Sequence, residues 1–390
     1  MNGSSCVCIF STLYLPSVGG VENYTAHLAH ALAQDGYRVI VVTLNTHDRN
    51  AFESEDLIEV VRLPCHHIFR SRYPFPKRNE EYQRLMAWLH NQKIDYVVVN
   101  ARFYLHSYEG LSFAQRKGIA PILIEHGSAH LTLGNPAADA VIRLTEHAIT
   151  MAERRFEASH YGVSTKASSW LSHFGIKSHG ELPNSIDADA YANSASNRSY
   201  HKELELPEDA FIVSFVGRLV QEKGILELAK AVQIENSDRH IIVLAAGDGP
   251  LRKSLSSYIN ERFKLLGKLG SEDIAALFAQ SDAMCLPSRS EGFATSLLEA
   301  AACWTPALTT PVGGVEELIP DGDYGTVIPS REPETIRAAL ESMSIDRNRT
   351  KMQGIRVGEL VRESYSWSRT AHLVVRACQK AQNRLSNSID

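Results

Sequence analysis

Two glutamates, Glu291 and Glu299, lie eight positions apart in the stretch "EGFATSLLE", with a glycine and small or hydroxyl residues between them. A loop carboxylate accepts hydrogen bonds from sugar hydroxyls, and the backbone N–H groups that open a helix bind phosphate. A second carboxylate inside that helix accepts from ribose hydroxyls, as acidic residues do in dinucleotide folds. The stretch therefore predicts a nucleotide-sugar site. Ser296 and Glu299 also fit a capping box, an alternative that explains Glu299 but not Glu291.

Two cations, Arg218 and Lys223, follow the apolar run "FIVSFV" in the stretch "GRLVQEKG". A guanidinium fork and an ammonium point charge beside a helix N-terminus form a suitable clamp for a pyrophosphate. The alternative is ordinary solvated charge on a loop.

Two further strand ends carry candidate residues. The stretch "PSVGGVE" places Gly20 at the start of a helical pattern, where bare backbone can approach an anion, although an ordinary turn also explains it. His126 ends the apolar run "PILIEH". A histidine at this position is more often structural than catalytic, but it gains weight if a cleft passes the end of its strand.

Alternating strand and helix patterns must position these residues. The run "CVCIFS" is followed by apolar residues at helical spacing and then by "RVIVVTL", which predicts a right-handed βαβ unit. The runs "YVVVN" and "PILIEHG" are continuously apolar, as expected for strands covered on both faces. The second half repeats the rhythm with "FIVSFVG", "HIIVLAAG", "FKLLG", "AMCLPS" and "PALTT".

The pattern predicts two consecutive doubly wound α/β domains, as the length of 390 residues also suggests. The polar stretch 187–207 is interpreted as the linker and the start of the second domain. A last helical pattern, "YSWSRTAHLVVRACQKAQNRL", has no strand after it and must pack on something already built. We expect domains at 1–186 and 187–365, with the final helix, 366–390, packing back on the first.

Composition limits the partners and the compartment. A net charge of −5 argues against a nucleic-acid binder, which needs a basic face. Six scattered cysteines without a C-x-x-C pair indicate buried free thiols in a reducing compartment. The N-terminus is interpreted as a core strand rather than a signal peptide, and no apolar run approaches the roughly 18 residues of a membrane span. We expect a cytoplasmic protein that can still sit on the inner face of the plasma membrane.

Taken together, the motifs resemble the family 4 (group 1) glycosyltransferases of the GT-B fold. The matching stretches include "PSVGGVENYTAHLAHALAQDGYRVIVVT", "EHG", "LPNSID", "VGRLVQEKG", "GDGP", "LGKLGSEDI", "SEGFATSLLEAAACWTPALTTPVGGVEELI" and "YSWSRTA", in the family's order over nearly the whole chain. The resemblance implies two Rossmann-like domains facing across a cleft, with the acceptor in the first and the nucleotide-sugar in the second. It also implies retaining transfer from a UDP- or GDP-sugar, without metal or cofactor, and with the departing phosphate oxygen taking the acceptor's proton.

The family's site residues carry over by motif. Arg218 and Lys223 are expected to hold the diphosphate, Glu291 the donor-sugar hydroxyls and Glu299 the ribose. His126 is expected to approach the reacting sugar. The remaining donor-binding positions are expected at Gly20, Leu269, Gly292, Phe293, Ala294 and Thr295. Two departures exist: Ala294 and Ser185 stand where the family commonly has glycine, and the first puts the identity of the donor sugar in doubt.

The acceptor is expected to be a lipid-linked or surface-polysaccharide intermediate. The stretch "RLPCHHIFRSRYPFPKR" interleaves aromatic residues with Arg62, Arg70, Arg72, Lys77 and Arg78, a mixture that suits anionic lipid headgroups. An ordinary solvated loop is the alternative, and its prolines argue against a regular amphipathic helix. Arg102, after "YVVVN", is a second candidate contact for an acceptor phosphate.

Three other functions remain open: a nucleotide-sugar-binding protein without catalysis, a transferase for a soluble small acceptor, and a GT-B phosphorylase or epimerase. A phosphorylase on the usual plan needs a pyridoxal-binding lysine, which the sequence does not identify.

Overall fold

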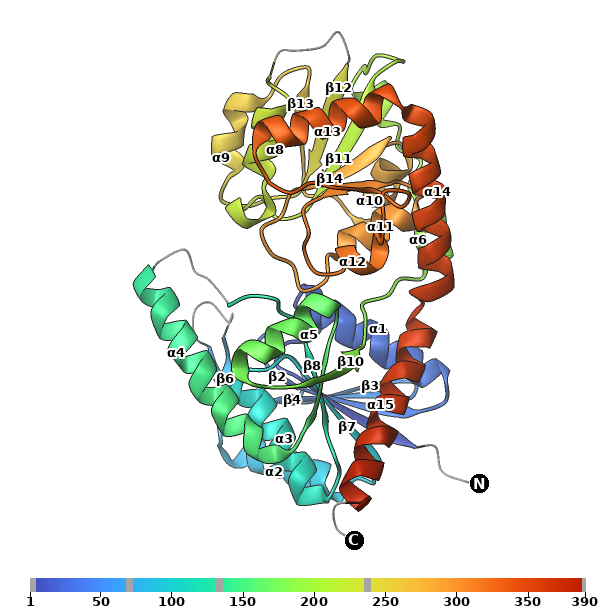
Figure 1. The fold of residues 1–390 in the computed structure, drawn as a ribbon. Coiled ribbons are helices and arrows are strands. Elements are labelled where there is room, and N and C mark those ends of the chain that lie inside the picture. Colours follow the sequence, from blue (N-terminus) through green and yellow to red (C-terminus); the bar gives the residue numbers. More distant parts are fainter. Residues whose placement is uncertain (1–4, 68–72, 131–135, 235–239, 388–390) are drawn as a thin grey trace. The chain divides into compact units, whose positions relative to one another are not determined.

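The computed structural model describes residues 5–67, 73–130, 136–234 and 240–387, and it divides into two compact units (Figure 1). The first unit is Met1–Asn184 with Trp367–Asp390, and the second is Ser185–Ser366. These limits lie within two residues of the expected domain boundaries at 186, 365 and 366.

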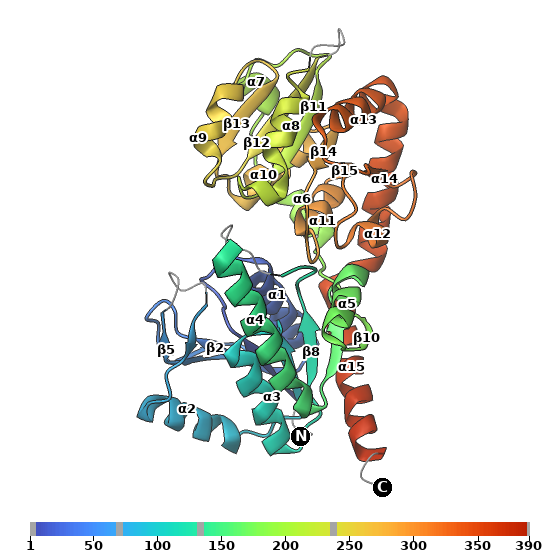
Figure 2. The same cartoon turned by 60° about the vertical axis from the view of Figure 1, so that its left-hand side comes forward.

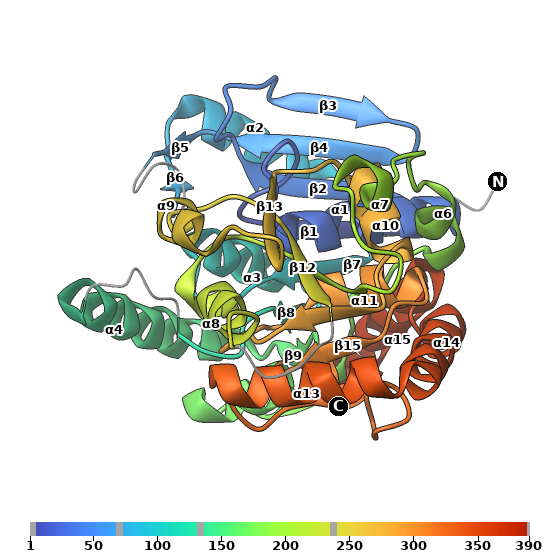
Figure 3. The same ribbon diagram turned by 90° about the horizontal axis from the view of Figure 1, so that it is seen from above.

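The first unit is built on one eight-stranded sheet in the order β10-β9-β8-β7-β1-β2-β4-β3. Figure 3 shows β3, β4, β2, β1, β7 and β8 following one another across it. All neighbouring pairs are parallel except β3 with β4. The strands are β1 (Cys6–Ser11), β2 (Arg38–Leu44), β3 (Phe52–Glu55), β4 (Ile58–Leu63), β7 (Tyr96–Asn100), β8 (Ile122–Glu125), β9 (Ser159–Gly162) and β10 (Ser178–Glu181).

Helices cover both faces of this sheet because both faces of its central strands are apolar, and β1 is buried at every position. Cys6, Cys8 and Phe10 share a core cluster with α2 (Glu80–Asn91) and α3 (Leu105–Lys117), and α1 (Gly20–Gln34) packs against β1, β2 and α15. Helix α15 (Trp367–Asn387) contacts α1, β7 and β8, so the last helix crosses back to the first unit as predicted (Figure 2). Helix α5 (Thr165–Leu171) packs against β8, β9 and β10, and α4 (Pro136–Glu153) packs against α3.

The second unit contains a six-stranded parallel sheet in the order β13-β12-β11-β14-β15-β16. Its strands are β11 (Phe211–Val216), β12 (Ile241–Ala246), β13 (Phe263–Gly267), β14 (Ala283–Leu286), β15 (Ala307–Thr309) and β16 (Thr326–Val327). Its helices are α6 (Ala188–Asn193), α7 (Tyr200–Glu203), α8 (Ile225–Ala231), α9 (Arg252–Leu255), α10 (Ser271–Ala279), α11 (Thr295–Ala302), α12 (Val315–Leu318), α13 (Pro333–Ile345) and α14 (Arg347–Ser364). The doubly wound α/β prediction is confirmed for both units.

The polar stretch 187–207 is more ordered than the sequence indicates. It forms α6 and α7, each opened by a side-chain cap, from Asp187 and from Ser199. Tyr200 is buried in the core cluster of the second unit, and its hydroxyl donates to the carbonyl of Asp273 at 3.0 Å. One buried aromatic anchors a segment whose composition alone suggests a linker.

The basic stretch between β4 and α2 forms a short antiparallel pair, β5 (Cys65–His66) with β6 (Phe75–Pro76). Within the described ranges, no helix is both long enough and apolar enough to span a bilayer. All six cysteines are free thiols, and five are buried as predicted, while Cys65 is partly exposed.

Candidate active site

An ion pair joins two loops of the second unit. The ammonium of Lys223 lies 2.6 Å from Oε1 of Glu291, and the Ser288 hydroxyl donates to the same oxygen at 2.7 Å. Lys223 follows β11 and Glu291 follows β14, which are neighbours in the sheet although the residues are 68 positions apart. The chain turns from β11 to β12 on one side and later returns to β14 on the other. The pair therefore lies at the topological switch point, where open α/β sheets bind their ligands.

Glycines allow these loops to approach so closely. A Cβ on Gly224 would lie 2.1 Å from the carbonyl oxygen of Pro287, and the residue has φ +71°. The Arg289 N–H donates to the carbonyl of Glu222 at 2.7 Å, next to Lys223. Because a side chain at position 224 would push the two loops apart, the glycine is a requirement for the ion pair.

The segment Gly292 to Thr295 leads from the pair into α11. A Cβ on Gly313 would lie 2.1 Å from the carbonyl of Gly292, so the chain after β15 packs directly against this segment. Phe293 and Ala294 are buried, and Thr295 is exposed. The N-cap residue of α11 is Ala294, and no side chain in the described part of the structure caps this helix. The first N–H groups of the helix thus lack a side-chain acceptor, which suits an anion.

Glu299 lies in the second turn of α11, in a poorly solvated position. Burial raises the pKa of its carboxyl from 4.5 to about 7. The capping-box alternative is wrong, because Ser296 is already inside the helix and caps nothing. A poorly solvated carboxyl that does not cap the helix can accept hydrogen bonds from a ligand.

The other two donor-side predictions lie at the surface. Arg218 follows β11 directly and is exposed, with no ion pair to any residue that the structure describes. Leu269 follows β13 and is half-buried against the core of the same unit. Neither position contradicts the expected contact with diphosphate or base, and both remain predictions.

In the first unit, His126 lies just beyond β8 and is fixed by a chain of hydrogen bonds. Its Nε2 lies 3.2 Å from Oδ1 of Asn100, whose amide Nδ2 donates to the Thr25 hydroxyl at 2.8 Å. Since Oδ1 only accepts, Nε2 carries the proton and Nδ1 keeps its lone pair. Tyr24 meets the ring edge-on at 4.8 Å, and burial lowers the pKa of His126 to about 3. The imidazole is therefore neutral at pH 7 and can accept, but not donate, at Nδ1.

Gly20 is the first residue of α1, and a Cβ placed there would meet nothing within 4 Å. The preceding Gly19 is the N-cap residue and provides no side chain to cap the helix. The position is open, as a phosphate contact requires, and the packing itself does not demand glycine at position 20.

The prediction for Arg102 is wrong. Its side chain is 0% exposed and is held by Glu125 at 2.8 Å and Glu146 at 2.7 Å, with the Phe174 ring 3.6 Å from the guanidinium. Arg102 lies two residues beyond the end of β7, between Ala101 and Phe103, which have φ +64° and +67°. A guanidinium enclosed by two carboxylates is a structural charge and is not available to an acceptor phosphate.

The basic residues between β4 and α2 have different environments in the fold. Arg62 is buried, with Nη2 2.8 Å from Glu53, so it cannot meet a membrane. Lys77 is exposed, and Arg78 is largely exposed while pairing with Glu109. The expected acceptor contacts Arg70 and Arg72 lie outside the described residues.

Sequence reasoning missed three supports of these sites. Ser288 holds Glu291, Gly313 carries the loop into α11, and Asn100 orients His126. The pair of glycines in "PVGGVEE" was a readable signal of close backbone approach. Ser288 and Asn100 gave no signal, because their importance depends on which strands are neighbours.

Two family models match the chain. "Glycosyltransferase Family 4" matches residues 18–188, and "Glycosyl transferases group 1" matches residues 196–356. An uncharacterized glycosyltransferase of Methanocaldococcus jannaschii is 24% identical over 97% of this chain and 98% of its own. A phosphatidylinositol N-acetylglucosaminyltransferase subunit of Saccharomyces cerevisiae is 22% identical over 95% of this chain and 81% of its own.

Among solved structures, the Anabaena protein HepE in complex with UDP and glucose has a similar fold. The TM-score is 0.71 at 16% identity, over 96% of this chain and 100% of that one.

Proposed function

Because the chain belongs to the group 1, or family 4, glycosyltransferases and has the GT-B fold, we propose that it is a retaining transferase for a UDP- or GDP-sugar. The observation that carries this proposal is the Lys223–Glu291 pair at the switch point of the second unit, beside the uncapped start of α11. A cation for phosphate, a carboxylate for hydroxyls and free helix N–H groups are the three features that a nucleotide-sugar needs.

In the reaction, the bond between the sugar's anomeric carbon and the diphosphate oxygen breaks. The acceptor oxygen forms the new bond on the same face of the sugar, and its proton passes to the departing phosphate oxygen. Lys223 and Arg218 stabilise the negative charge that develops on the diphosphate, an effect worth several kcal/mol for a well-placed donor. Glu291 accepts from the sugar hydroxyls and fixes the orientation of the ring.

Two further groups are expected to contact the donor, one from each unit. Glu299 accepts hydrogen bonds from the ribose hydroxyls. These bonds replace the water that burial keeps away from its carboxyl. His126 presents the lone pair of its neutral Nδ1 to a hydroxyl of the reacting sugar, since its Nε2 is engaged by Asn100. This role does not require His126 to exchange a proton.

A transfer assay tests the proposal against binding without catalysis. Radiolabelled UDP-glucose, UDP-N-acetylglucosamine and GDP-mannose are incubated with the protein and a membrane lipid extract, and labelled product is counted. Glu291→Ala should abolish transfer with little loss of melting temperature, because the residue lies in a loop and its ion pair contributes at most about 1 kcal/mol. A folded Glu291→Ala protein that transfers sugar at the normal rate would contradict the assignment, and binding without product from any donor would favour the non-catalytic alternative.

We propose that the donor diphosphate needs no metal, because Lys223 and Arg218 supply two positive charges on one loop. The second unit has two Asp-x-Asp sequences, at positions 187–189 and 321–323, but the first lies at the start of α6 and the second follows α12, so neither directly follows a strand of the sheet. Transfer should therefore continue in EDTA. Loss of activity that Mn²⁺ or Mg²⁺ restores would overturn this part of the proposal.

For the acceptor we propose a lipid-linked intermediate at the cytoplasmic face of the membrane. Three apolar side chains of α4, the α4 stripe (Val141, Leu144 and Met151), are 64%, 73% and 73% exposed on one side of the helix. A cavity of about 580 Å³ lies between β6, α3 and α4, and its lining is mainly apolar, together with the paired side chains of Arg78 and Glu109. An exposed apolar stripe and exposed basic residues in the same unit suit a peripheral contact with anionic lipid. The yeast relative's name refers to a phosphatidylinositol acceptor, which supports the same class.

Liposome co-sedimentation tests this contact with and without anionic lipid. One variant replaces the α4 stripe by serine, and a second replaces Arg70, Arg72, Lys77 and Arg78 by serine. The control replaces four exposed lysines of the second unit by serine: Lys202, Lys230, Lys253 and Lys351. Each basic residue near the surface contributes about 1 kcal/mol, so the second variant should dissociate while the control stays bound. If the unaltered protein remains in the supernatant at low salt, a soluble small acceptor becomes the better explanation.

A further inference from the structure

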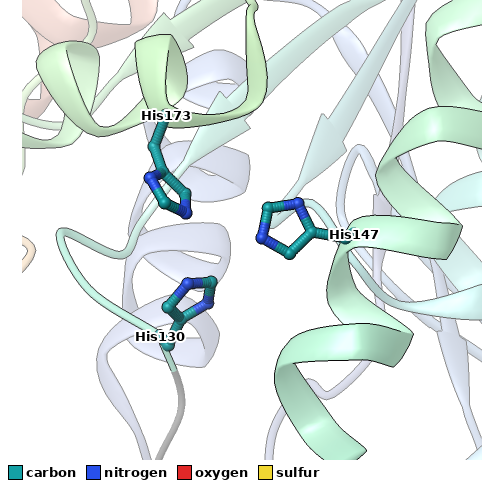
Figure 4. A group of neighbouring side chains, drawn as sticks. All are labelled: His130, His147 and His173. Atoms are coloured by element: carbon teal, nitrogen blue, oxygen red, sulfur yellow. The ribbon is translucent and has the colours of Figure 1, made fainter. Parts of the chain in front are cut away.

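Three histidines of the first unit converge on one point outside the residues discussed so far. The histidine cluster consists of His130 after β8, His147 in α4 and His173 in a short helix, Ser172–Phe174, after α5. Their ring centroids form a nearly equilateral triangle with sides of 5.6, 5.1 and 5.3 Å. One nitrogen of each ring lies within 4.8 Å of the other two, and the rings point toward a shared space (Figure 4).

A buried carboxylate orients one of these rings. Nδ1 of His130 lies 2.6 Å from Oε2 of Glu146, whose other oxygen holds Arg102 at 2.7 Å. The bond to Glu146 leaves Nε2 of His130 available. Metal-binding histidines typically donate their second ring nitrogen to a carboxylate in this way, which fixes the ring and makes it a better ligand.

Aromatic contacts restrain the other two rings. Trp170 stacks on His173 at 4.7 Å with an interplanar angle of 5°. Phe174 lies 4.8 Å from the ring of His147. His147 and His173 are exposed and His130 is half-buried, so the shared space remains accessible from solvent.

From this geometry we propose that the histidine cluster binds a divalent transition-metal ion of the zinc class, with water as the fourth ligand. Imidazole nitrogens suit zinc and its neighbours, whereas Mg²⁺ and Ca²⁺ require oxygen ligands. A tetrahedral ion with Zn–N bonds of about 2.0–2.1 Å places its nitrogens about 3.4 Å apart. The nitrogens lie within 4.8 Å of one another, so the rings need only a small shift to reach this spacing.

The ion would connect three separate segments of the first unit. His130 follows β8, His147 belongs to α4 and His173 follows α5, so a bound metal holds α4 against the rest of the unit. The site also leads toward His126 through a continuous chain. Glu146 binds Arg102, and Arg102 binds Glu125. Glu125 in turn accepts from the Gly127 N–H at 2.8 Å, and these last two residues flank His126 in the chain. The metal therefore acts on the position of α4 and of the β8 loop, and this role is independent of the proposed donor chemistry.

Direct titration tests the site on the full chain without a histidine tag, after EDTA treatment and desalting. Zn²⁺ binding is followed by calorimetry, and Co²⁺ binding by visible absorption, which distinguishes nitrogen ligands from thiolates. The variants are His147→Ala and His173→Ala, both at exposed positions where the fold should tolerate the change. The matched control is His240→Ala, which removes an exposed histidine of the second unit that pairs with Asp209.

The unaltered protein and the His240→Ala control should bind one equivalent of Zn²⁺, with tetrahedral Co²⁺ bands and a higher melting temperature. Each cluster variant should lose at least tenfold in affinity, because loss of even an outer partner of a metal ligand typically costs that much. Equal Zn²⁺ affinity in all four proteins, or binding only at millimolar Zn²⁺, would overturn the proposal. Thiolate-type Co²⁺ absorption would do so as well, since it would place the ion on a cysteine.

Discussion

Replacing Glu291 by Gln distinguishes the role of the Glu291 carboxylate from that of the Lys223 ammonium, because the two groups form an ion pair in the free protein. The ammonium lies 2.6 Å from the carboxylate, and the two side chains are 26% and 12% exposed. A diphosphate that takes Lys223 must weaken this pair. Exposed ion pairs contribute up to about 1 kcal/mol, and we take that value for this partly buried one. Removing the carboxylate charge should thus strengthen binding of UDP or GDP, without sugar, by about fivefold.

The same substitution should nearly abolish sugar transfer, because a neutral amide is a weaker acceptor for the sugar hydroxyls. Lys223→Ala should act in the opposite sense on the nucleotide. It removes a charge-assisted hydrogen bond to phosphate, worth about 1.5–3 kcal/mol, so UDP or GDP should bind about 10- to 150-fold more weakly. Calorimetric titration with each nucleotide and a transfer assay on the same preparations give both quantities.

Glu222→Gln is the matched control for this pair. It removes one negative charge from the same loop, at an exposed position adjacent to Lys223 that forms no ion pair with any described residue. Nucleotide affinity and transfer should both stay within twofold of the unaltered protein. The reasoning is refuted if Glu291→Gln weakens nucleotide binding as strongly as Lys223→Ala does, since the carboxylate would then be a nucleotide ligand rather than a competitor.

The remaining predictions concern four single substitutions. The pKa of Glu299 is raised from 4.5 to about 7, so between these pH values the folded protein keeps a proton that the unfolded chain has lost. The free energy of unfolding should therefore fall by about 3 kcal/mol as the pH rises across this window. Glu299→Gln should flatten this pH dependence, measured by urea unfolding. Gly313→Ala should cost about 1–3 kcal/mol and abolish transfer, because its Cβ meets a carbonyl at 2.1 Å. Gly20→Ala should keep the melting temperature and weaken donor binding; unchanged transfer would remove Gly20 from the site. Arg102→Ala should cost about 3–5 kcal/mol by leaving two buried carboxylates unpaired, and a selective rise in acceptor KM without that loss would restore its acceptor role.

Local patterns were enough to nominate most residues of the second unit's candidate site. The apolar run before "GRLVQEKG" and the run before "RSEGFATSLLE" identify two strands, and parallel strands deliver the residues that follow them to one edge of a sheet. Lys223 and Glu291 were therefore expected to share a ligand. That they contact each other in the free protein depends on β11 and β14 being neighbours, which no local pattern reports.

Other predictions depended on environment and failed or were missed. Arg102 stands at a strand end like the residues of the donor site, but a turn of the backbone directs it into the interior, toward Glu125 and Glu146. The histidine cluster draws its members from positions 130, 147 and 173, whose spacing matches no metal-binding motif. Only the packing of α4 and α5 against the β8 end brings them together.

What the sequence determined by itself is the alternation of strands and helices, the two α/β domains and the types of residue at the strand ends. These are local properties. The spacing of apolar residues depends on whether one face or both faces of an element are buried, and a glycine indicates close approach of the backbone. Tertiary structure alone decided which loops meet, which charges are enclosed and which side chains share a space. Those outcomes depend on the order of strands in a sheet and on the energy of burying charge, and both arise from contacts between residues far apart in the chain.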